Sequence, residues 1–379
     1  MLLTIVLLLA ASISIISLSC KVVGVGTVSF HSSGNLRYLS PLPSISPSNI
    51  EPQLSTEVPN YTGFGQDYLW HYSDEPSTVW GSDTDYIATQ LDYWSARGYS
   101  TSRLTFSFDD AESCLSLDLR VSLYDQEKMD SVIAFFYRHG IRSILDHHDF
   151  YDKLYYYGSW TELNSWLAVA EHYKNDSRVA GFNLANEVRV VAWTGRVSAT
   201  DGPVGDVKNN YQLTKAYVYL TMRIREVDPS RVIFFPTFCM YKDYSETSMT
   251  VQLWYDMLKQ AGQELNYDIL NDDKVIFDLV HPYYFQNELD GGDNWDFGLM
   301  PSEKVTWYDD KYFKPAVALF GANRLWVGET YAHEEKTEDL QVEWLKGITT
   351  LCKDYGIGFQ ILCFLDSRET TRINGLAIC

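Results

Sequence analysis

The sequence predicts an α/β protein built on a closed (β/α)8 barrel, the TIM-barrel architecture. From about residue 61 onward, short β-rich runs alternate with longer stretches whose apolar residues recur at helical spacing. Apolar strands separated by helices are typical of a parallel sheet that helices cover. Eight such repeats within one domain favour a closed barrel over an open sheet. No G-x-G-x-x-G motif opens a helix and no P-loop is present, which counts against a nucleotide-binding fold.

Eight segments are predicted as strands because each is short, apolar and rich in β-branched or aromatic residues. They lie near residues 63–68 and at residues 100–106, 141–146, 179–184, 231–235, 274–280, 324–328 and 357–364. Seven longer segments between them are predicted as helices, at residues 84–97, 125–138, 160–174, 210–226, 248–264, 302–321 and 335–353. The last of these helices has Leu340, Trp344, Leu345, Ile348 and Leu351 on one face.

The composition describes a folded, acidic protein. Hydrophobic residues make up 46% of the chain and charged residues 21%, which excludes disorder of the whole chain. The net charge of −20 would repel phosphate backbones and anionic lipid surfaces. We therefore expect a neutral partner and no nucleic acid. Contact with a membrane is expected only through an N-terminal anchor.

The N-terminus is predicted to contain two segments outside the fold. Residues 1–20 are expected to be a signal peptide or a membrane anchor, because residues 2–20 carry no charge. Residues 21–60 are expected to be a linker or extended arm, since five of the 12 prolines lie between Pro41 and Pro59. An export signal implies a secreted or extracellular protein, and an uncleaved anchor would hold it at the cell surface. Residues 61–379 remain for one catalytic domain.

Polar residues gather where the predicted strands end, which is where (β/α)8 barrels carry their chemistry. Arg103 lies in the second strand, and Asp146-His147-His148-Asp149 ends the third. Asn186-Glu187 follows the fourth strand, His281-Pro282-Tyr283-Tyr284 follows the sixth, and Glu329 follows the seventh. Because parallel strands end at the same rim of a barrel, these side chains are expected to converge on one site.

Glu187 and Glu329 are the candidate catalytic pair. Two carboxyl groups facing each other are what cleavage of a glycosidic bond needs, one to protonate the departing oxygen and one to attack the sugar. Their surroundings must differ, so that one stays protonated while the other stays ionised. Arg103 is placed to keep the attacking carboxylate anionic, and Asn186 to hold the 2-hydroxyl of the sugar.

These residues resemble glycoside hydrolase family 5, the cellulase family. GFNLANE (181–187) is similar to the family's acid/base strand, and WVGE (326–329) to its nucleophile strand. GYSTSRLTF (98–106), LDHHDF (145–150) and HPY (281–283) resemble its arginine strand, its Asp-x-His and its His-x-Tyr. Each motif alone is weak, but their order along residues 61–379 makes the resemblance strong.

The resemblance implies a retaining, endo-acting β-glycoside hydrolase that needs no cofactor and no metal. Glu187 would be the acid/base and Glu329 the nucleophile. Arg103, His148, Asn186, His281 and Tyr283 would bind substrate or support the pair, with the Tyr283 hydroxyl directed at the nucleophile. The expected substrate is a β-1,4-linked polysaccharide, most simply a β-glucan, as for an endo-β-1,4-glucanase. Retention predicts that the two carboxyl groups lie about 5–5.5 Å apart.

Two departures from the family pattern keep alternatives open. The family places a tryptophan at the end of its eighth strand as a sugar platform, whereas GFQILCFLD (358–366) offers only Leu362 or Phe364. The chain also leaves little length for an eighth helix after that strand. A β-mannanase, another family 5 specificity, or a surface carbohydrate-binding pseudoenzyme therefore remain alternatives to the cellulase.

Two further expectations concern metals and aromatic residues. The Asp146–Asp149 run is rich in possible metal ligands, but neighbouring residues on a strand point to opposite faces, so at most half of them could share one metal. A structural or substrate-positioning role is therefore favoured over a metal site for this run. Aromatic residues in the loops after strands are candidates for stacking on sugar faces. This group comprises Tyr155, Tyr156, Tyr157, Trp160, Trp193, Tyr284, Phe285, Trp295 and Tyr331.

Overall fold

The structure, a computed structural model, describes residues 60–66, 84–108, 124–147, 160–186, 207–236, 250–284, 300–332 and 337–362. All of them belong to one compact unit, Glu51–Cys379. The segment predicted as a signal or anchor and nearly all of the predicted arm lie outside these residues. Among the helices that the described ranges contain, none combines the length and the apolar character needed to span a bilayer.

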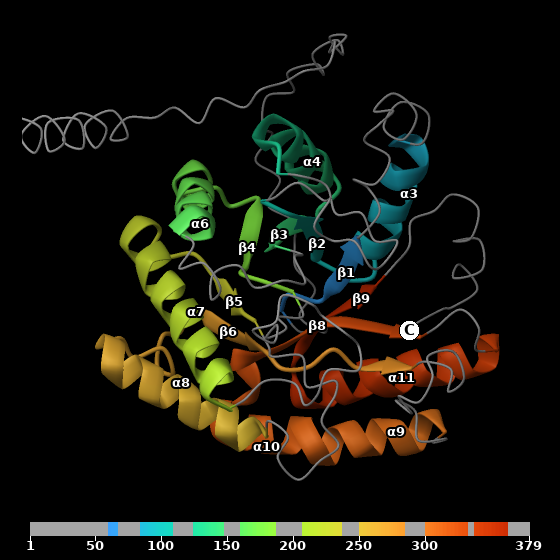
Figure 1. The fold of residues 1–379 in the computed structure, drawn as a ribbon. Coiled ribbons are helices and arrows are strands. Elements are labelled where there is room, and N and C mark those ends of the chain that lie inside the picture. The colour runs from blue at the N-terminus through green and yellow to red at the C-terminus, as the bar shows by residue number, and fades with distance from the viewer. Residues whose placement is uncertain are drawn as a thin grey trace, which may run out of the picture. The chain divides into compact units, whose positions relative to one another are not determined.

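Eight parallel strands of the described chain close into a barrel (Figure 1). They are β1 (Gly63–Gln66), β2 (Thr101–Phe106), β3 (Arg142–His147), β4 (Val179–Asn183), β5 (Ile233–Phe235), β6 (Val275–Asp278), β8 (Leu325–Ala332) and β9 (Gly358–Leu362). Each pairs with the next in this order, and β9 pairs with β1 to complete the ring. The (β/α)8 prediction is confirmed.

Helices lie around the outside of the barrel, between successive strands (Figure 1). They are α3 (Thr84–Ser95), α4 (Gln126–Arg138), α6 (Trp160–His172), α7 (Val207–Val227), α8 (Val251–Leu265), α9 (Pro301–Tyr308), α10 (Lys314–Phe320) and α11 (Glu338–Tyr355). A single helix was expected over 302–321, but a π-helical turn, η3 (Asp309–Phe313), joins α9 to α10. Pro315 explains the break, because it has no backbone N–H to donate inside a continuous α-helix.

Two short elements were not predicted. A single 3-10 turn, η4 (Ala322–Arg324), leads into β8. Strand β7 (Tyr283–Tyr284) pairs in parallel with Tyr331 and Ala332, at the far end of β8. A two-residue strand leaves no periodic signal in the sequence. Its importance is positional, because it continues beyond β6 and carries Tyr283 alongside the end of β8.

The barrel interior changes from apolar to polar along the strands. A buried apolar cluster fills the interior near the strand N-termini and consists of Ile144, Ala180, Phe234, Ile276 and Trp326. Side chains alternate along a strand, so the next inward position is two residues further on. Two residues beyond Ile144 and Ile276 are Asp146 and Asp278, both buried. The apolar layer therefore supports a polar layer at the carboxyl ends of the strands.

The segment before β1 closes the bottom of this interior. The carbonyl oxygen of Tyr61 accepts hydrogen bonds from Trp326 Nε1 at 3.1 Å and from Gln360 Nε2 at 2.7 Å. The Tyr61 ring also meets Phe234 edge-on, with ring centroids 5.2 Å apart. The Trp326 indole N–H and the Gln360 side-chain NH2 group thus each have an acceptor, as buried polar groups require.

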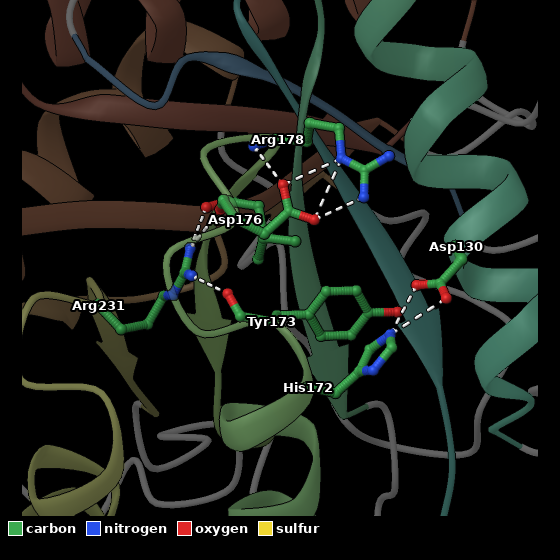
Figure 2. Close-up of polar contacts among 7 residues, drawn as sticks. Asp130, His172, Tyr173, Asp176, Arg178 and Arg231 are labelled. Carbon is green, nitrogen blue, oxygen red and sulfur yellow. Dashed lines mark hydrogen bonds and ion pairs between the residues drawn. The ribbon is translucent and has the colours of Figure 1, made fainter. Parts of the chain in front are cut away.

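The connection from α6 to β4 is fixed by a polar network at the N-terminal end of the strands (Figure 2). Asp176 accepts hydrogen bonds from the Arg178 side chain at 2.7 to 3.1 Å and from the Arg178 backbone N–H at 2.9 Å. Arg231 donates to the backbone oxygens of Tyr173, Asp176 and Val179. Residues at this end of a (β/α)8 barrel serve stability rather than chemistry.

Asp176→Asn is expected to lower the free energy of unfolding by about 1–2 kcal/mol at pH 7. Burial raises the pKa of Asp176, but hydrogen bonds from Arg178 outweigh it, so the native pKa lies below the usual value. A carboxyl group with a depressed native pKa contributes stability above its unfolded pKa of about 3.9. That contribution is lost as the pH falls through the native pKa.

Urea unfolding at pH 7 and at pH 3 measures this effect. The difference between wild type and Asp176→Asn should be smaller at pH 3 than at pH 7. Asp256→Asn is the matched control, because Asp256 is an exposed carboxylate whose partner is the neutral Gln252. Equal losses from the two variants at pH 7 would contradict a stabilising role for the Asp176–Arg178 pair.

Candidate active site

Four of the predicted site residues converge at the carboxyl ends of the strands. Arg103 comes from β2, Asn186 follows β4, Tyr283 lies in β7 and Glu329 lies in β8. Arg103 donates to Asn186 Oδ1 at 2.8 Å and to Glu329 Oε2. Residues from four different strands and loops thus form one contiguous hydrogen-bonded group.

Both oxygens of the Glu329 carboxylate are engaged by charged or hydroxyl donors. Oε2 accepts from Arg103 Nη2, and Oε1 accepts from the Tyr283 hydroxyl at 2.5 Å. The residue is 6% exposed, so its side chain is held in place by these contacts and by packing. Charge-assisted hydrogen bonds of this kind fix the direction of a carboxylate. The Glu329 carboxylate is therefore both oriented and largely shielded from solvent.

Arg103 is itself held from a second side. It is fully buried, and its Nε lies 3.4 Å from Asp146 Oδ2. Asn183 Nδ2 donates to Asp146 Oδ1 at 2.7 Å, which ties Asp146 to β4. One guanidinium therefore faces two carboxylates and the Asn186 amide oxygen. A planar guanidinium has enough donors for all three, and a lysine ammonium does not.

His281 lies in the same region, beside the strand that carries Glu329. Its Nε2 is 2.8 Å from Asp278 Oδ2, and both side chains are almost completely buried. The other carboxylate oxygen of Asp278 accepts from the backbone N–H of Gly328 at 2.9 Å. His281 is thus joined to β8 one residue before Glu329.

Two of the predicted site residues, Glu187 and His148, lie outside the described residues. The expected distance between the Glu187 and Glu329 carboxyl groups therefore stays a prediction. Asn186, which precedes Glu187, is described and is buried against Arg103. Of the two predicted catalytic carboxyl groups, only that of Glu329 lies within the described residues.

The Asp146–Asp149 run does not behave as one cluster where it is described. Asp146 points inward to Arg103, whereas His147 packs outward among the rings of Phe106, Phe108 and Trp166. This alternation excludes a metal shared by Asp146 and His147. Over the described ranges, no group of three or more His, Cys, Asp or Glu side chains is close enough to hold a metal ion.

The proposed stacking role is wrong for Tyr284. Its ring is 3% exposed and stacks on Trp344 of α11, with centroids 5.5 Å apart and an interplanar angle of 19°. Alternation along β7 explains this, because Tyr283 points to Glu329 and its neighbour must point to the helix layer. The placement of Tyr155, Tyr156, Tyr157, Trp193, Phe285 and Trp295 and of the Trp160 side chain lies outside what the structure describes. The Tyr331 stacking role stays a prediction.

Sequence reasoning placed Asp146 among the residues expected at the site, but it missed Asn183 and Asp278 as supports. Each of these two interrupts an otherwise apolar strand, in GFNL and VIFDLV respectively. A polar residue at an inward strand position is costly to bury without a partner. That signal could have marked both residues.

The similarity of this chain to known proteins concerns its family and its fold. Residues 64–362 match the model of the family described as cellulase, glycosyl hydrolase family 5. No curated protein matches the chain.

Several solved structures share the fold at low sequence identity. A broad-specificity GH5-4 endoglucanase from Clostridium cellulovorans is 14% identical, with a TM-score of 0.54 over 85% of this chain and 92% of that one. Another, from Clostridium acetobutylicum, is 16% identical, with a TM-score of 0.52 over 80% and 87%. A third structure, described as an endoglucanase, is 14% identical, with a TM-score of 0.53 over 83% and 96%. At these identities the likeness establishes the barrel and nothing finer.

Proposed function

The chain belongs to the cellulase family, glycosyl hydrolase family 5, and from this membership we propose that it is an endo-β-1,4-glucanase that cleaves β-glucan with retention of configuration. Membership establishes a glycoside hydrolase with a polysaccharide substrate. The observation that supports the finer proposal is the Glu329 carboxylate, held by Arg103 and Tyr283 at the carboxyl end of β8.

Glu329 is the nucleophile in this proposal. Its carboxylate attacks the anomeric carbon, the glycosidic C–O bond breaks, and Glu187 gives its proton to the departing oxygen. The product of this step is a glycosyl ester on Glu329. Glu187, now a carboxylate, takes a proton from water while the water oxygen attacks the same carbon. The ester breaks, Glu329 leaves as a carboxylate, and Glu187 is protonated again.

Arg103 and Asn186 support both steps. The guanidinium of Arg103 lies beside the attacking carboxylate and stabilises the negative charge that returns to it in the second step. Asn186 accepts from Arg103 through Oδ1, which directs its amide nitrogen away from that side chain. This orientation suits a donor to the sugar's 2-hydroxyl, a contact that strengthens in the transition state.

The choice of a β-glucan rests on three observations. The related solved structures named above are described as endoglucanases. The net charge of −20 suits a neutral polysaccharide better than a polyanion. The uncharged N-terminal segment fits an exported or surface-held enzyme, which is where a polymer too large to enter a cell would be cut.

Reducing-sugar release from carboxymethylcellulose, barley β-glucan, glucomannan, galactomannan and xylan tests this proposal. We expect cleavage of the glucans, with retention seen by NMR of the first anomer released. Cleavage of galactomannan alone would make the enzyme a mannanase. Binding of a glycan without any release would favour the pseudoenzyme.

Tyr283→Phe is expected to reduce kcat about tenfold to a hundredfold while leaving the fold intact. The change removes only the hydroxyl that donates to Glu329 Oε1. Without that bond the Glu329 carboxylate loses one of the two hydrogen-bond donors that orient it and stabilise its negative charge. The measurement is kcat and KM on the best glucan, together with the thermal unfolding midpoint.

Tyr284→Phe is the matched control for Tyr283→Phe. It removes a hydroxyl from the neighbouring ring, which faces α11 instead of Glu329. We expect its kcat to stay within about twofold of wild type, because the Tyr284 ring packs on Trp344 and makes no hydrogen bond to Glu329 that would be lost. Equal losses in both variants would contradict the assignment of Tyr283.

A further inference from the structure

Asp278, the last residue of β6, contacts the strand that carries Glu329. Its Oδ1 accepts a hydrogen bond from the backbone N–H of Gly328 at 2.9 Å, and its Oδ2 lies 2.8 Å from His281 Nε2. The side chains of Asp278 and His281 are each 1% exposed. A carboxylate buried to this degree must find hydrogen-bond donors, and here one comes from a backbone and one from a ring.

The approach between Asp278 and β8 leaves no space at residue 328. A Cβ atom added to Gly328 would lie 2.9 Å from His281 Nε2 and nearer still to Asp278 Oδ2. The absence of a side chain at this position therefore lets Asp278 and His281 pack against the backbone directly beside Glu329. The three residues form one tight unit, named here the Asp278 clamp.

The clamp also determines where His281 carries a proton. An ionised carboxylate only accepts hydrogen bonds, so its contact with Nε2 requires a proton on that nitrogen. A carboxylate partner is the usual means by which a protein selects one ring nitrogen of histidine and fixes the ring orientation.

Two short routes connect the clamp with Glu329. The first is the peptide bond from Gly328 to Glu329. The second runs from His281 through Pro282 to Tyr283, whose hydroxyl donates to Glu329. The Thr330 hydroxyl donates to the carbonyl oxygen of Pro282 at 2.8 Å, which ties this second route to β8 as well.

We propose that Asp278 is a positioning residue that fixes the backbone at Glu329 and holds His281 in the form protonated at Nε2. The inference rests on the proposed function, since it assumes that Glu329 reacts with the sugar. Asp278 itself does not touch the reacting atoms. It acts through Gly328 and His281.

Asp278→Asn tests the proposal, because asparagine has the same shape as aspartate. Its side-chain oxygen can still accept from Gly328, but its NH2 group would face His281 Nε2 and can only donate. The His281 proton is then expected to move to Nδ1. We expect kcat to fall about 10- to 100-fold, because a small misplacement of a reacting group is enough to cost about that much. KM and the thermal unfolding midpoint should stay close to wild type.

NMR of protein labelled with ¹⁵N-histidine supplies a readout that a purely structural role would not move. Wild type should show His281 with the Nε2–H pattern, and Asp278→Asn should show the Nδ1–H pattern. The spectrum of His281→Gln assigns the signal. This measurement needs no substrate. If wild type cleaves no glycan, the proposed function is wrong, but the NMR experiment still tests the role of Asp278. An unchanged His281 tautomer in Asp278→Asn would contradict the proposed role of Asp278.

Asp228→Asn is the matched control. Asp228 is equally buried but pairs with Arg231 at the opposite end of the strands, at 3.0 Å. We expect it to lower the thermal midpoint without changing kcat. If Asp278→Asn also lowers only the midpoint, or leaves kcat unchanged, Asp278 serves stability alone and the inference is overturned.

Discussion

Glu329→Gln is expected to lower kcat by about 10⁴–10⁶-fold, the loss typical of removing a nucleophile that acts within a catalytic unit. Glutamine has nearly the same shape, and its amide oxygen can still accept from Arg103 or Tyr283. It cannot form the glycosyl ester, because an amide oxygen is a poor nucleophile toward an anomeric carbon. The loss should appear in kcat, with the thermal unfolding midpoint changed by only a few degrees.

A rescue experiment separates the nucleophile from the acid/base. In Glu329→Ala, added azide can enter the space left by the carboxylate and attack from the nucleophile's side of the ring. With an activated dinitrophenyl β-cellobioside, the expected product is the α-glycosyl azide. In Glu187→Ala the glycosyl ester still forms, and azide then attacks from the opposite side to give the β-azide. The same anomer from both variants would mean that the roles of the two residues are assigned wrongly.

The barrel was predictable because each of its signals is local. Runs such as VIFD and LWVG predict buried strands, and the spacing of Trp344 and Ile348 predicts one face of a helix. Neither prediction needs information from the rest of the chain. The convergence of Arg103, Asn186 and Glu329 followed from topology, since parallel strands end at one rim. The π-turn before Pro315 and the two-residue strand β7 were missed because each is too short to produce a periodic pattern of apolar residues.

The contacts that support the site were not predicted, for a different reason. Asp146, Asn183 and Asp278 owe their roles to partners on neighbouring strands, and sequence spacing does not give strand register. Asp146 reaches Arg103 because β3 lies beside β2, and Asp278 reaches Gly328 because β6 lies beside β8. The error on Tyr284 has the same origin. Tyr284 does follow β6, but it lies in the short strand β7. Because Tyr283 in that strand faces Glu329, the Tyr284 ring faces the helix layer instead.

Arg103→Met is expected to lower the free energy of unfolding by about 3–5 kcal/mol, in addition to a severe loss of kcat. The substitution keeps much of the side-chain volume but removes the guanidinium that pairs with both Asp146 and Glu329. Two carboxylates would then remain buried near each other without that cation, which is the costly way to break a buried ion pair. Urea unfolding gives the stability, and assays at a temperature where the variant is folded give kcat.

Arg103→Lys distinguishes charge from geometry. A lysine restores a positive charge, so much of the stability lost in Arg103→Met should return. Its ammonium cannot reach Asp146, Asn186 and Glu329 together, because it lacks the planar fork of donors. We therefore expect kcat to stay low in Arg103→Lys. Full recovery of kcat would contradict a geometric role for the guanidinium.

Arg231→Met controls for the loss of any buried arginine. Arg231 bonds to Asp228 and to three backbone oxygens at the opposite end of the barrel strands. Its loss should lower stability by a comparable amount but leave kcat of the folded enzyme unchanged, since nothing in that network contacts Glu329. The contrast isolates what Arg103 does at the site: it pairs with the Glu329 carboxylate and directs it, while Asp146 and Asn186 hold Arg103 in turn.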